Sequence, residues 1–295
     1  MARKIECTVP YELDGEKLIV VLRGYLKISA RLLPKLKNDP EGLLRNGEHI
    51  RTVDRVKCGD VITVTFPDEE CLIEPSDTKG LVIVYEDEDI LIVNKSADIA
   101  MHPTHNHQGD TLANKIVAYF KEKSKNAVFR AVGRLDKCTS GLVIIALNAH
   151  SANILSENVE KEYLALVGGE YKGSGTINKS IIRPDPMKTY RWVGDDGEYA
   201  VTHWKALKTD GKRTLMKISL ETGRTHQIRV HFASEGTPLL GDDMYGSKEL
   251  CVPRAALHCH KLSFIHPVTK NPLTFEAPLP DDMKAIADKL TDIVN

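Results

Sequence analysis

The chain has 295 residues, of which 42% are hydrophobic and 27% charged, and this balance is typical of a globular protein rather than a disordered or fibrous one. No apolar run approaches the roughly 18 residues of a membrane helix, and residues 1–10 are too polar for a secretory signal, which argues against a membrane protein and favours the cytoplasm. The net charge is −1, so any nucleic-acid-binding function depends on where the charges lie rather than on their sum.

The first part of the chain is locally basic. Residues 17–57 contain ten Lys or Arg and four Asp or Glu, a local charge of +6. Residues 46–64 predict a turn, a strand, a second turn and a second strand with alternating apolar side chains. This part is either an RNA-binding surface or an ordinary solvated one. The cations that would contact RNA are Lys27, Arg31, Lys35 and Arg45.

A polar stretch with a proline, residues 70–80, is the best candidate for a linker. We therefore predict two domains, 1–74 and 75–295. The second begins with a predicted β-hairpin over 81–93, because two β-branched apolar runs flank an acidic turn. Further along, Asp110 can cap a helix whose apolar face ends near Phe120.

The polar segment 133–141 leads directly into the apolar run 142–147, which predicts a buried strand. Asp136 is therefore held beside the core, where an unpaired carboxylate is costly and needs a positive partner. The best source of that charge is the segment 221–231. From the residues alone, a turn-forming role and a catalytic role for Asp136 remain equally open.

The rest of the chain is rich in predicted strands. A helix over 149–158 is followed by a strand over 161–167 that carries Tyr163, and two alternating segments, 198–208 and 213–220, predict antiparallel strands. Many strands with few, scattered helices indicate an α+β fold with a mostly antiparallel sheet.

Two helix starts are predicted near the C-terminal end. Thr225 can cap a helix that runs to about Gly236, which leaves Arg224 outside the first turn and free to reach Asp136. Asp281 can cap a closing helix with an apolar stripe from Met283 to Ile293.

The cysteines and histidines do not show the spacing of a common metal site. The six cysteines form no Cys-x-x-Cys pair, so we expect free thiols. The histidines that cluster in the sequence also match no common ligand pattern, so we predict no metal. These histidines are His102, His105 and His107, and His258 and His260 with Cys251 nearby.

Two segments resemble the signatures of the RluA-type pseudouridine synthases. Arg134–Lys137 with Thr139–Leu142 is similar to the active-site signature, and Gly223–His231 is similar to the second one. Further similar blocks occur in the family's order between Leu81 and Pro278, and several matches in register are more specific than one. The basic N-terminal part resembles the small αL RNA-binding domain of the S4 ribosomal-protein type, with 29–33 on its helical part.

The resemblance implies that uridine in RNA, ribosomal or transfer, is isomerised to pseudouridine after the base has been flipped out. Asp136 would be the nucleophile, attacking either the ribose carbon or C6 of uracil. Arg224 would hold this carboxylate through an ion pair, Tyr163 would stack on the base and could accept a proton, and Arg134 would fill the gap in the RNA. The other implied substrate contacts are Leu135, Thr139, His226, Gln227, Ile228, Arg229 and His102.

The reaction implied by the resemblance needs no cofactor, and we expect a monomer without an obligate protein partner. The sequence departs from the commoner family pattern at Gly133, where a histidine is usual, and at Cys138, where an Asp is common. One rival is a non-catalytic RNA-binding or ribosome-assembly protein. The other is a hydrolase that uses Asp136 with a second acid, Glu221 or Asp242.

Overall fold

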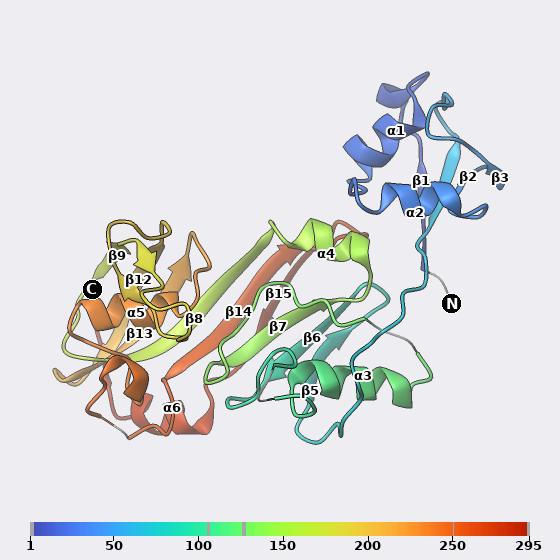
Figure 1. Ribbon diagram of the computed structural model, residues 1–295. Coiled ribbons are helices and arrows are strands. Elements are labelled where there is room, and N and C mark those ends of the chain that lie inside the picture. Colours follow the sequence, from blue (N-terminus) through green and yellow to red (C-terminus); the bar gives the residue numbers. More distant parts are fainter. Residues whose placement is uncertain (1–2, 105–106, 126–127, 250, 294–295) are drawn as a thin grey trace.

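The structure is a computed structural model that describes residues 3–104, 107–125, 128–249 and 251–293. It has an α+β fold with mostly antiparallel sheets, as predicted. A long, twisted sheet forms the main body, and a smaller unit built from the first 66 residues lies at one end of it (Figure 1). Within the described ranges, no helix is both long and apolar enough to cross a bilayer.

The small unit has its own four-stranded antiparallel sheet, in the order β1-β4-β2-β3. Its core includes Leu18, Leu22, Leu36 and Ile62, all fully buried. Residues 29–33, placed on the helical part of this unit by the sequence, form a turn that leads into α2, which begins at Leu33. The elements are β1 (Lys4–Thr8), η1 (Tyr11–Leu13), α1 (Leu18–Val20), the π-helical η2 (Val21–Tyr25), α2 (Leu33–Asn38), β2 (Leu43–Arg45), β3 (Glu48–His49) and β4 (Val61–Thr65).

The main sheet follows the order β16-β12-β13-β8-β14-β7-β6-β5, with β15 on β14 and β9 on β12. All its pairings are antiparallel except that of β14 with β7. Its strands are β5 (Val82–Glu86), β6 (Ile90–Lys95), β7 (Ser140–Ala146), β8 (Val159–Gly168), β9 (Ser174–Asn178), β12 (Val201–Thr209), β13 (Arg213–Leu220), β14 (Leu257–Ile265), β15 (Pro272–Glu276) and β16 (Thr291–Asp292). A separate two-stranded ribbon consists of β10 (Ile181–Ile182) and β11 (Trp192–Val193).

Helices cover parts of this body, and two predicted caps are wrong. α3 (Leu112–Glu122) is capped by Thr111, because its hydroxyl accepts from the Asn114 backbone while the Asn114 side chain reaches back. Asp110 instead contacts His107. α6 (Asp281–Ala287) already contains Asp281, and Pro280 precedes it. The predicted apolar stripe is cut short because the chain enters β16 after α6. The other helices are α4 (Ala149–Leu155), α5 (Gln227–Ser234) and η3 (Asp243–Tyr245).

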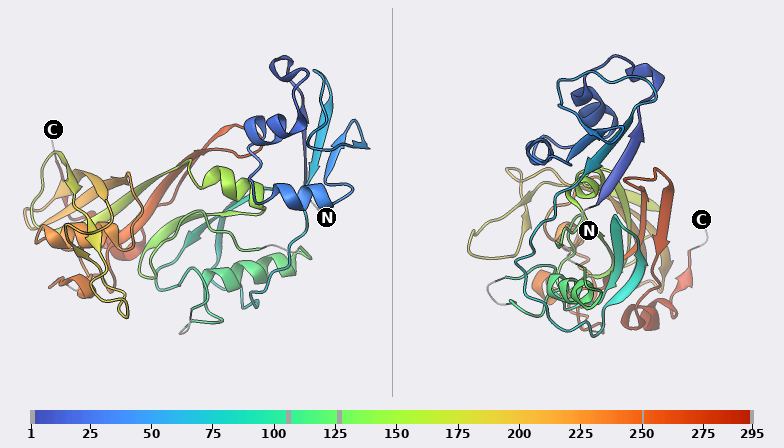
Figure 2. Two further views of the ribbon diagram at one scale, coloured as in Figure 1. Left: turned by 45° about the horizontal axis from the view of Figure 1, so that its top comes forward. Right: turned by 90° about the vertical axis from the view of Figure 1, so that its right-hand side faces the viewer.

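The small unit contacts the main body through the residue before its first strand, β1, and the residue after its last strand, β4. Arg3 binds the carboxylate of Asp89 through two hydrogen bonds of 3.1 and 2.8 Å. Phe66, whose amide donates to the Arg3 carbonyl, stacks on His150 of α4 with ring centroids 5.3 Å apart. Two further views show the small unit at one end of the main body (Figure 2), where the Asn153 side chain of α4 also donates to the Lys27 carbonyl at 3.4 Å.

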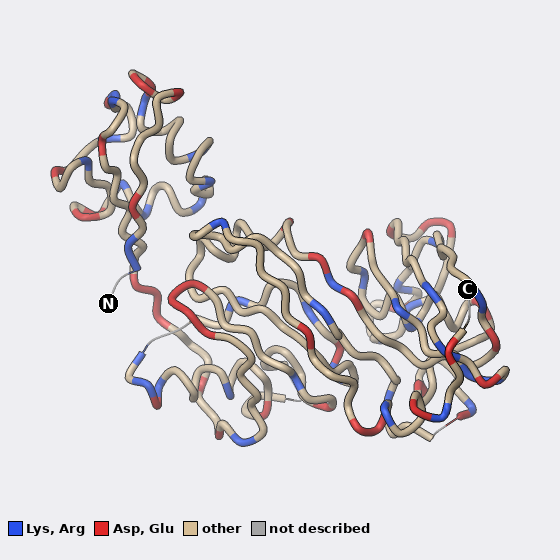
Figure 3. Tube along the Cα trace, turned by 180° about the vertical axis from the view of Figure 1, so that it is seen from behind, with Lys and Arg blue, Asp and Glu red and all other residues tan. Residues whose placement is uncertain are grey.

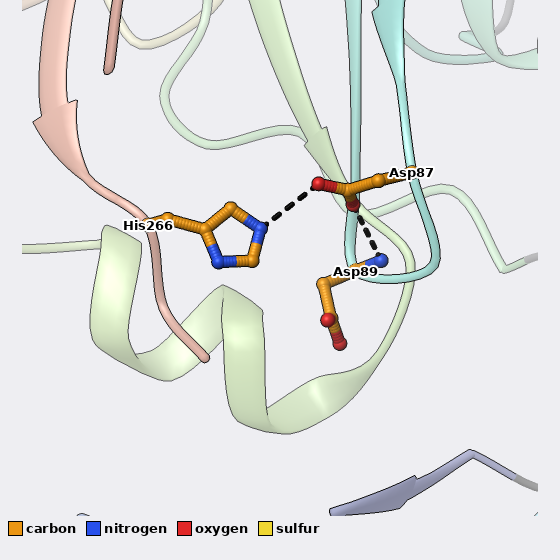
Figure 4. Close-up of side chains that lie close together, drawn as sticks. All are labelled: Asp87, Asp89 and His266. Carbon is orange, nitrogen blue, oxygen red and sulfur yellow. Dashed lines mark hydrogen bonds and ion pairs between the residues drawn. The ribbon is translucent and has the colours of Figure 1, made fainter. Parts of the chain in front are cut away.

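Asp87, Asp89 and His266 lie close together beside this contact (Figure 4). These residue types can bind a cation when their ligand atoms are free. Their oxygens already have partners, however. Asp87 accepts from His266, from Tyr85 and from two backbone amides, and Asp89 accepts from Arg3 and from a side-chain amide. The cluster therefore stabilises the junction, and its donors leave a metal little room.

The six cysteines are free thiols, which confirms that prediction. Acidic and basic residues are interspersed along both units (Figure 3). The predicted linker, residues 70–80, contains no helix or strand. Just before it, Glu69 bridges Lys35 of the small unit and Arg130 of the main body.

Candidate active site

Asp136 lies in a loop that ends at the buried strand β7. Each residue of β7 is buried, so the end of the loop is fixed, and the amide of Thr139 donates to the Asp136 carbonyl at 3.0 Å. Gly141 allows β7 to approach β14, because a Cβ there would lie only 2.3 Å from the carbonyl oxygen of Cys259. The Asp136 carboxyl remains 26% exposed and is therefore accessible to a ligand.

A fully buried lysine supports this loop from inside. The Lys95 ammonium donates to the carbonyls of Ser96, Ile99 and Lys137 at 2.9, 2.9 and 3.2 Å. It therefore holds the residue after Asp136 against the end of β6. Burial lowers the pKa of Lys95 to about 8, which brings its titration into an accessible range.

We expect the activity of the protein to fall above about pH 8, because neutral Lys95 donates fewer hydrogen bonds to the loop. Stability should not fall for the same reason. The folded pKa lies below the unfolded value, so the unfolded chain binds more protons and the contribution of Lys95 to the free energy of unfolding rises between about pH 8 and 10. Lys95→Met should reduce the rate roughly tenfold and abolish this alkaline limb. Single-turnover rates and melting temperatures measured from pH 6.5 to 9.5 test this. A variant whose rate still fell above about pH 8 would contradict the role of Lys95.

An open pocket collects most of the predicted site residues beside Asp136. Its walls come from the 134–139 loop, β8, the end of β13, the start of α5 and the start of β14. It is lined by Arg134, Leu135, Asp136, Thr139, Tyr163, Leu220, Gly223, Arg224, His226, Gln227, Ile228, Arg229 and Leu257. Segments that are far apart in the sequence therefore meet at one carboxylate.

The cation next to Asp136 is Arg229, so the predicted pair with Arg224 is wrong. The Nη1 of Arg229 lies 3.5 Å from the Asp136 carboxylate. Arg224 also lines the pocket, but it binds the carbonyl of Tyr199 and the carboxylate of Glu198 at the surface.

The buried carboxylate of Asp242 fixes the Arg229 guanidinium. Two hydrogen bonds of 2.8 Å join the two groups, and the guanidinium also lies 5.0 Å from the centre of the Tyr245 ring. Burial opposes the positive charge, but the Asp242 hydrogen bonds and the nearby Asp136 raise the pKa of Arg229 above its ordinary value. Arg229 is thus a permanent charge in a fixed orientation.

Arg229 rather than Arg224 lies beside Asp136 because α5 begins later in the sequence than predicted. The helix starts at Gln227, two residues after the predicted cap, Thr225, and its N-cap is His226 in a left-handed conformation with φ of 59°. The left-handed residue turns the chain sharply. As a result Arg224 lies outside the helix on the surface, and Arg229 lies in the first turn facing the pocket.

His226 presents its ring to Asp136. Its Nε2 lies 3.8 Å from the carboxylate, and its Nδ1 lies 2.8 Å from the Tyr245 hydroxyl. That hydroxyl accepts from the Arg191 amide and can donate its own proton to Nδ1, and in this tautomer the imidazole proton lies on Nε2, on the side of Asp136. Burial lowers the pKa of His226 despite the attraction of Asp136, so the ring is a neutral donor at pH 7.

Tyr163 lies in the wall of the pocket within β8. It is buried, and burial together with the nearby Cys259 and Asp136 raises its pKa well above the ordinary value. Thr139 also lines the pocket, and among the described residues its hydroxyl has no hydrogen-bond partner. The phenol of Tyr163 is therefore neutral, and the Thr139 hydroxyl, at the wall of the pocket, is a buried group without a partner in the described part of the chain.

The remaining predicted contacts differ in what they can offer. The side-chain amide of Gln227 is already occupied by Thr222, by Arg224 and by Val201 and Thr202 of β12, so it fixes the start of α5 instead. Leu135 and Ile228 are buried pocket walls.

Arg134 is exposed at the mouth of the pocket. His102 is not in the pocket wall. It lies edge-on to Phe129, and burial and the charge of Arg134 lower its pKa. His102 is therefore close to the mouth without lining it.

Of the two departures from the family pattern, Gly133 has a structural explanation and Cys138 has none. Gly133 has φ of 78°, and a Cβ there would lie 2.5 Å from the ammonium of Lys161, which donates to the Val132 carbonyl. A histidine at this position would collide with that ammonium. Cys138 is largely buried, which raises its pKa and keeps the thiol neutral.

The residues that other functions would require are engaged elsewhere. Glu221 pairs with His203 at the surface, and Asp242 is held by Arg229, so neither is placed as a free second acid for a hydrolase. His258 bonds the Ser140 hydroxyl and His260 the Ala277 carbonyl. His105 lies outside the described residues.

The sequence pattern did not identify three members of the site. Asp242 was considered only as a hydrolytic acid, and Tyr245 and Lys95 had no assigned role. A charged residue inside an otherwise apolar strand end is the signal that could have identified Lys95. Asp242 and Tyr245 gave no comparable signal, because their roles depend on contact with Arg229 and His226.

On the small unit, three of the four predicted RNA contacts are exposed: Lys27, Arg31 and Lys35. Lys35 pairs with Glu69, and Arg45 is half-buried with its guanidinium on the Arg55 carbonyl. Lys27 and Arg31 therefore have the charge most available to a ligand.

Comparison with known proteins gives one consistent family. A family model described as RNA pseudouridylate synthase matches residues 89–234. The RNA pseudouridine synthase YjbO of Bacillus subtilis is 38% identical, with 89% of this chain and 95% of the relative covered. The ribosomal large subunit pseudouridine synthase D of Buchnera aphidicola is 34% identical over 94% and 96%. The solved structure of human RNA pseudouridylate synthase domain containing 1 is 26% identical, with a TM-score of 0.60 over 75% and 93%.

Proposed function

Because this chain belongs to the RNA pseudouridine synthase family, we propose that it isomerises specific uridines of ribosomal RNA, with Asp136 as the nucleophile. The observation that carries the proposal is the Asp136 carboxylate, partly exposed in a pocket and held beside Arg229. A carboxylate that is charged, oriented and accessible is what a covalent mechanism needs.

The reaction moves the base without adding or removing any group. The bond from N1 of uracil to C1′ of the ribose breaks, the base rotates, and C5 bonds to C1′. The C5 proton leaves and N1 becomes protonated. Asp136 forms a transient bond either to C1′ or to C6, and that bond breaks before the product leaves. Both choices remain part of the proposal, and neither requires a cofactor.

Arg229, rather than Arg224, is the partner that we assign to the nucleophile. The guanidinium lies 3.5 Å from the carboxylate, and its own position is fixed by Asp242. His226, as a neutral donor, can bond either the carboxylate or a uracil carbonyl. Gln227 contributes by fixing the start of α5.

Tyr163 is proposed to stack on the uracil ring. Its raised pKa makes loss of its proton unfavourable, so a role as general base is the weaker proposal. Thr139 is proposed to shape the wall of the pocket, because its residue is buried there. Arg134 at the mouth is placed to fill the gap that the flipped nucleotide leaves in the RNA.

Residues 1–74 are proposed to form an S4-like RNA-binding domain and residues 75–295 the catalytic domain. The separate sheet and core of the small unit support this division. Cytoplasmic location and the absence of an obligate protein partner stay predictions from the sequence.

Neutralising exposed cations of the small domain should weaken RNA binding through its salt dependence. We expect Lys27→Gln with Arg31→Gln to reduce the slope of log affinity against log salt by about one for each phosphate that is no longer neutralised, with little change in single-turnover rate at saturating RNA. Filter binding between 50 and 300 mM salt measures the slope. Lys212→Gln, an exposed lysine in the turn between β12 and β13, is the control. An unchanged slope would refute a phosphate-binding role for Lys27 and Arg31.

Ribosomal RNA is proposed as the target because relatives of this length carry the name ribosomal large subunit pseudouridine synthase D. The test is to map pseudouridines in ribosomal and transfer RNA from cells with and without the gene. Loss of specific sites from ribosomal RNA, restored by the wild-type protein, supports the proposal. If pseudouridines were lost only from transfer RNA, the proposed target would be wrong, but the proposed reaction would stand.

A further inference from the structure

An exposed group of aromatic and basic side chains lies beside the active-site pocket. In the β10–β11 ribbon, Ile182 pairs with Trp192, and Ile181 pairs with Val193. Ile181 and Val193 face inward, where they pack with Val230 of α5. Since side chains alternate along a strand, Trp192 faces outward, and it is 58% exposed.

The aromatic rings of this ribbon are arranged in advance of any ligand. Tyr190 and Trp192 lie two residues apart on the same side, with ring centroids 5.8 Å apart and planes inclined by 32°. The Lys188 ammonium lies 5.6 Å from the centre of the Tyr190 ring. Large exposed apolar groups of this kind usually mark a binding site, because leaving a tryptophan in water has no structural benefit.

The loop between the two strands is also basic. It contains three cations, Arg183, Lys188 and Arg191, and one acid, Asp185. Among the residues whose side chains are described, none of these three cations forms an ion pair with a carboxylate; Arg183 and Arg191 bond backbone carbonyls. Two more acids, Asp195 and Asp196, lie in the next turn rather than in the loop. The three cations can therefore pair with an incoming anion.

Direct hydrogen bonds connect this ribbon to the pocket. The Arg191 amide donates to the Tyr245 hydroxyl at 2.9 Å, and that hydroxyl lies 2.8 Å from His226, which lines the pocket. On the following segment, Tyr199 is 54% exposed, and its carbonyl accepts from Arg224, another pocket residue. The backbone of the segments that carry these aromatic side chains is therefore hydrogen-bonded to residues of the pocket rim.

We propose that Lys188, Tyr190, Arg191, Trp192 and Tyr199 form a stacking surface for unpaired nucleotides that flank the target uridine. Alternating rings and cations suit single-stranded RNA, because each base offers a face for stacking and each phosphate a charge for pairing. A duplex cannot use this surface, since its bases stack on one another. The inference rests on the proposed function and narrows its substrate to uridines in loops or other unpaired segments.

Fluorescence of Trp192 provides a direct test. The chain has two tryptophans, so Trp204→Phe leaves Trp192 as the only one. With Asp136→Asn added to prevent turnover, we expect saturable quenching by an end-labelled single-stranded RNA with a central uridine, and much weaker quenching by the same sequence in a duplex. In the otherwise wild-type chain, Trp192→Ala should weaken single-strand binding roughly tenfold and Trp192→Phe less than threefold. Met187→Ala, at a residue 91% exposed in the same loop, is the matched control and should stay within twofold.

Each outcome decides the matter. Binding of the labelled RNA without quenching of Trp192, or equal quenching by the duplex, would overturn the stacking surface. Equal losses from Trp192→Ala and Met187→Ala would show a general loop effect and would also overturn it. If the chain bound no RNA at all, the proposed function would fall and the stacking surface with it. Normal turnover by Asp136→Asn would instead refute only the nucleophile, because quenching reports binding.

Discussion

Asp136→Asn should lower the single-turnover rate of pseudouridine formation by at least about a thousandfold, while RNA affinity stays within about tenfold. The amide has nearly the same shape as the carboxylate and still fits the pocket, but it cannot act as the nucleophile. Tritium release from RNA labelled at C5 of uridine measures the rate. Retention of the label on filters measures binding in the same samples.

Glu221→Gln provides the matched control for this experiment. Glu221 is a surface acid at the end of β13 that pairs with His203, and we expect its replacement to leave the rate nearly unchanged. A variant of Asp136 that turned over normally would exclude it as the nucleophile. Release of free uracil, with both acids essential, would point to the hydrolase instead.

The second large effect is expected at Arg229. Arg229→Lys keeps a positive charge but cannot bind Asp136 and Asp242 together, and we expect a loss of roughly a hundredfold in rate. Arg224→Lys should cost less than about tenfold, because the Arg224 side chain binds the Tyr199 carbonyl and the exposed Glu198 carboxylate rather than Asp136. Single-turnover assays at saturating RNA compare the two variants.

A stability measurement separates catalysis from folding in this comparison. Arg229→Ala leaves the Asp242 carboxylate buried without a counter-charge and should destabilise the protein by about 3–5 kcal/mol. Arg229→Lys should unfold closer to the wild-type temperature. If Arg224→Lys lost more activity than Arg229→Lys at equal stability, the ion-pair assignment made from the structure would be wrong.

The sequence was sufficient to place Asp136 but not its partner. An apolar run after a polar segment predicts a fixed loop, and β7 places Asp136 at the end of such a loop. The segment that supplies the positive charge was also identified. The choice between Arg224 and Arg229 depended on the conformation of His226, whose left-handed backbone is rare for a non-glycine residue and is not encoded by a local pattern.

The parts of the site that the sequence did not reveal are contacts between distant segments. Tyr245 and Asp242 act on residues of α5 that precede them, through hydrogen bonds that no periodicity predicts. The predicted cap of α3, Asp110, was wrong for a related reason. Asp110 and Thr111 are both good cap residues, and only the reciprocal bond with Asn114 decides between them.

The attachment of the small unit has a geometric consequence for the choice of uridine. Arg3 and Phe66 are neighbours on paired strands, and both contact the main body, so the unit is anchored by its own sheet rather than by the connecting segment alone. An RNA that contacts both units would be modified at a fixed distance from Lys27 and Arg31, since this anchor, together with the hydrogen bond from Asn153 of α4 to the Lys27 carbonyl, holds the small unit in place. Lengthening the segment 70–80 should then leave the identity of the modified uridine unchanged. Arg3→Ala should instead allow neighbouring uridines to be modified as well.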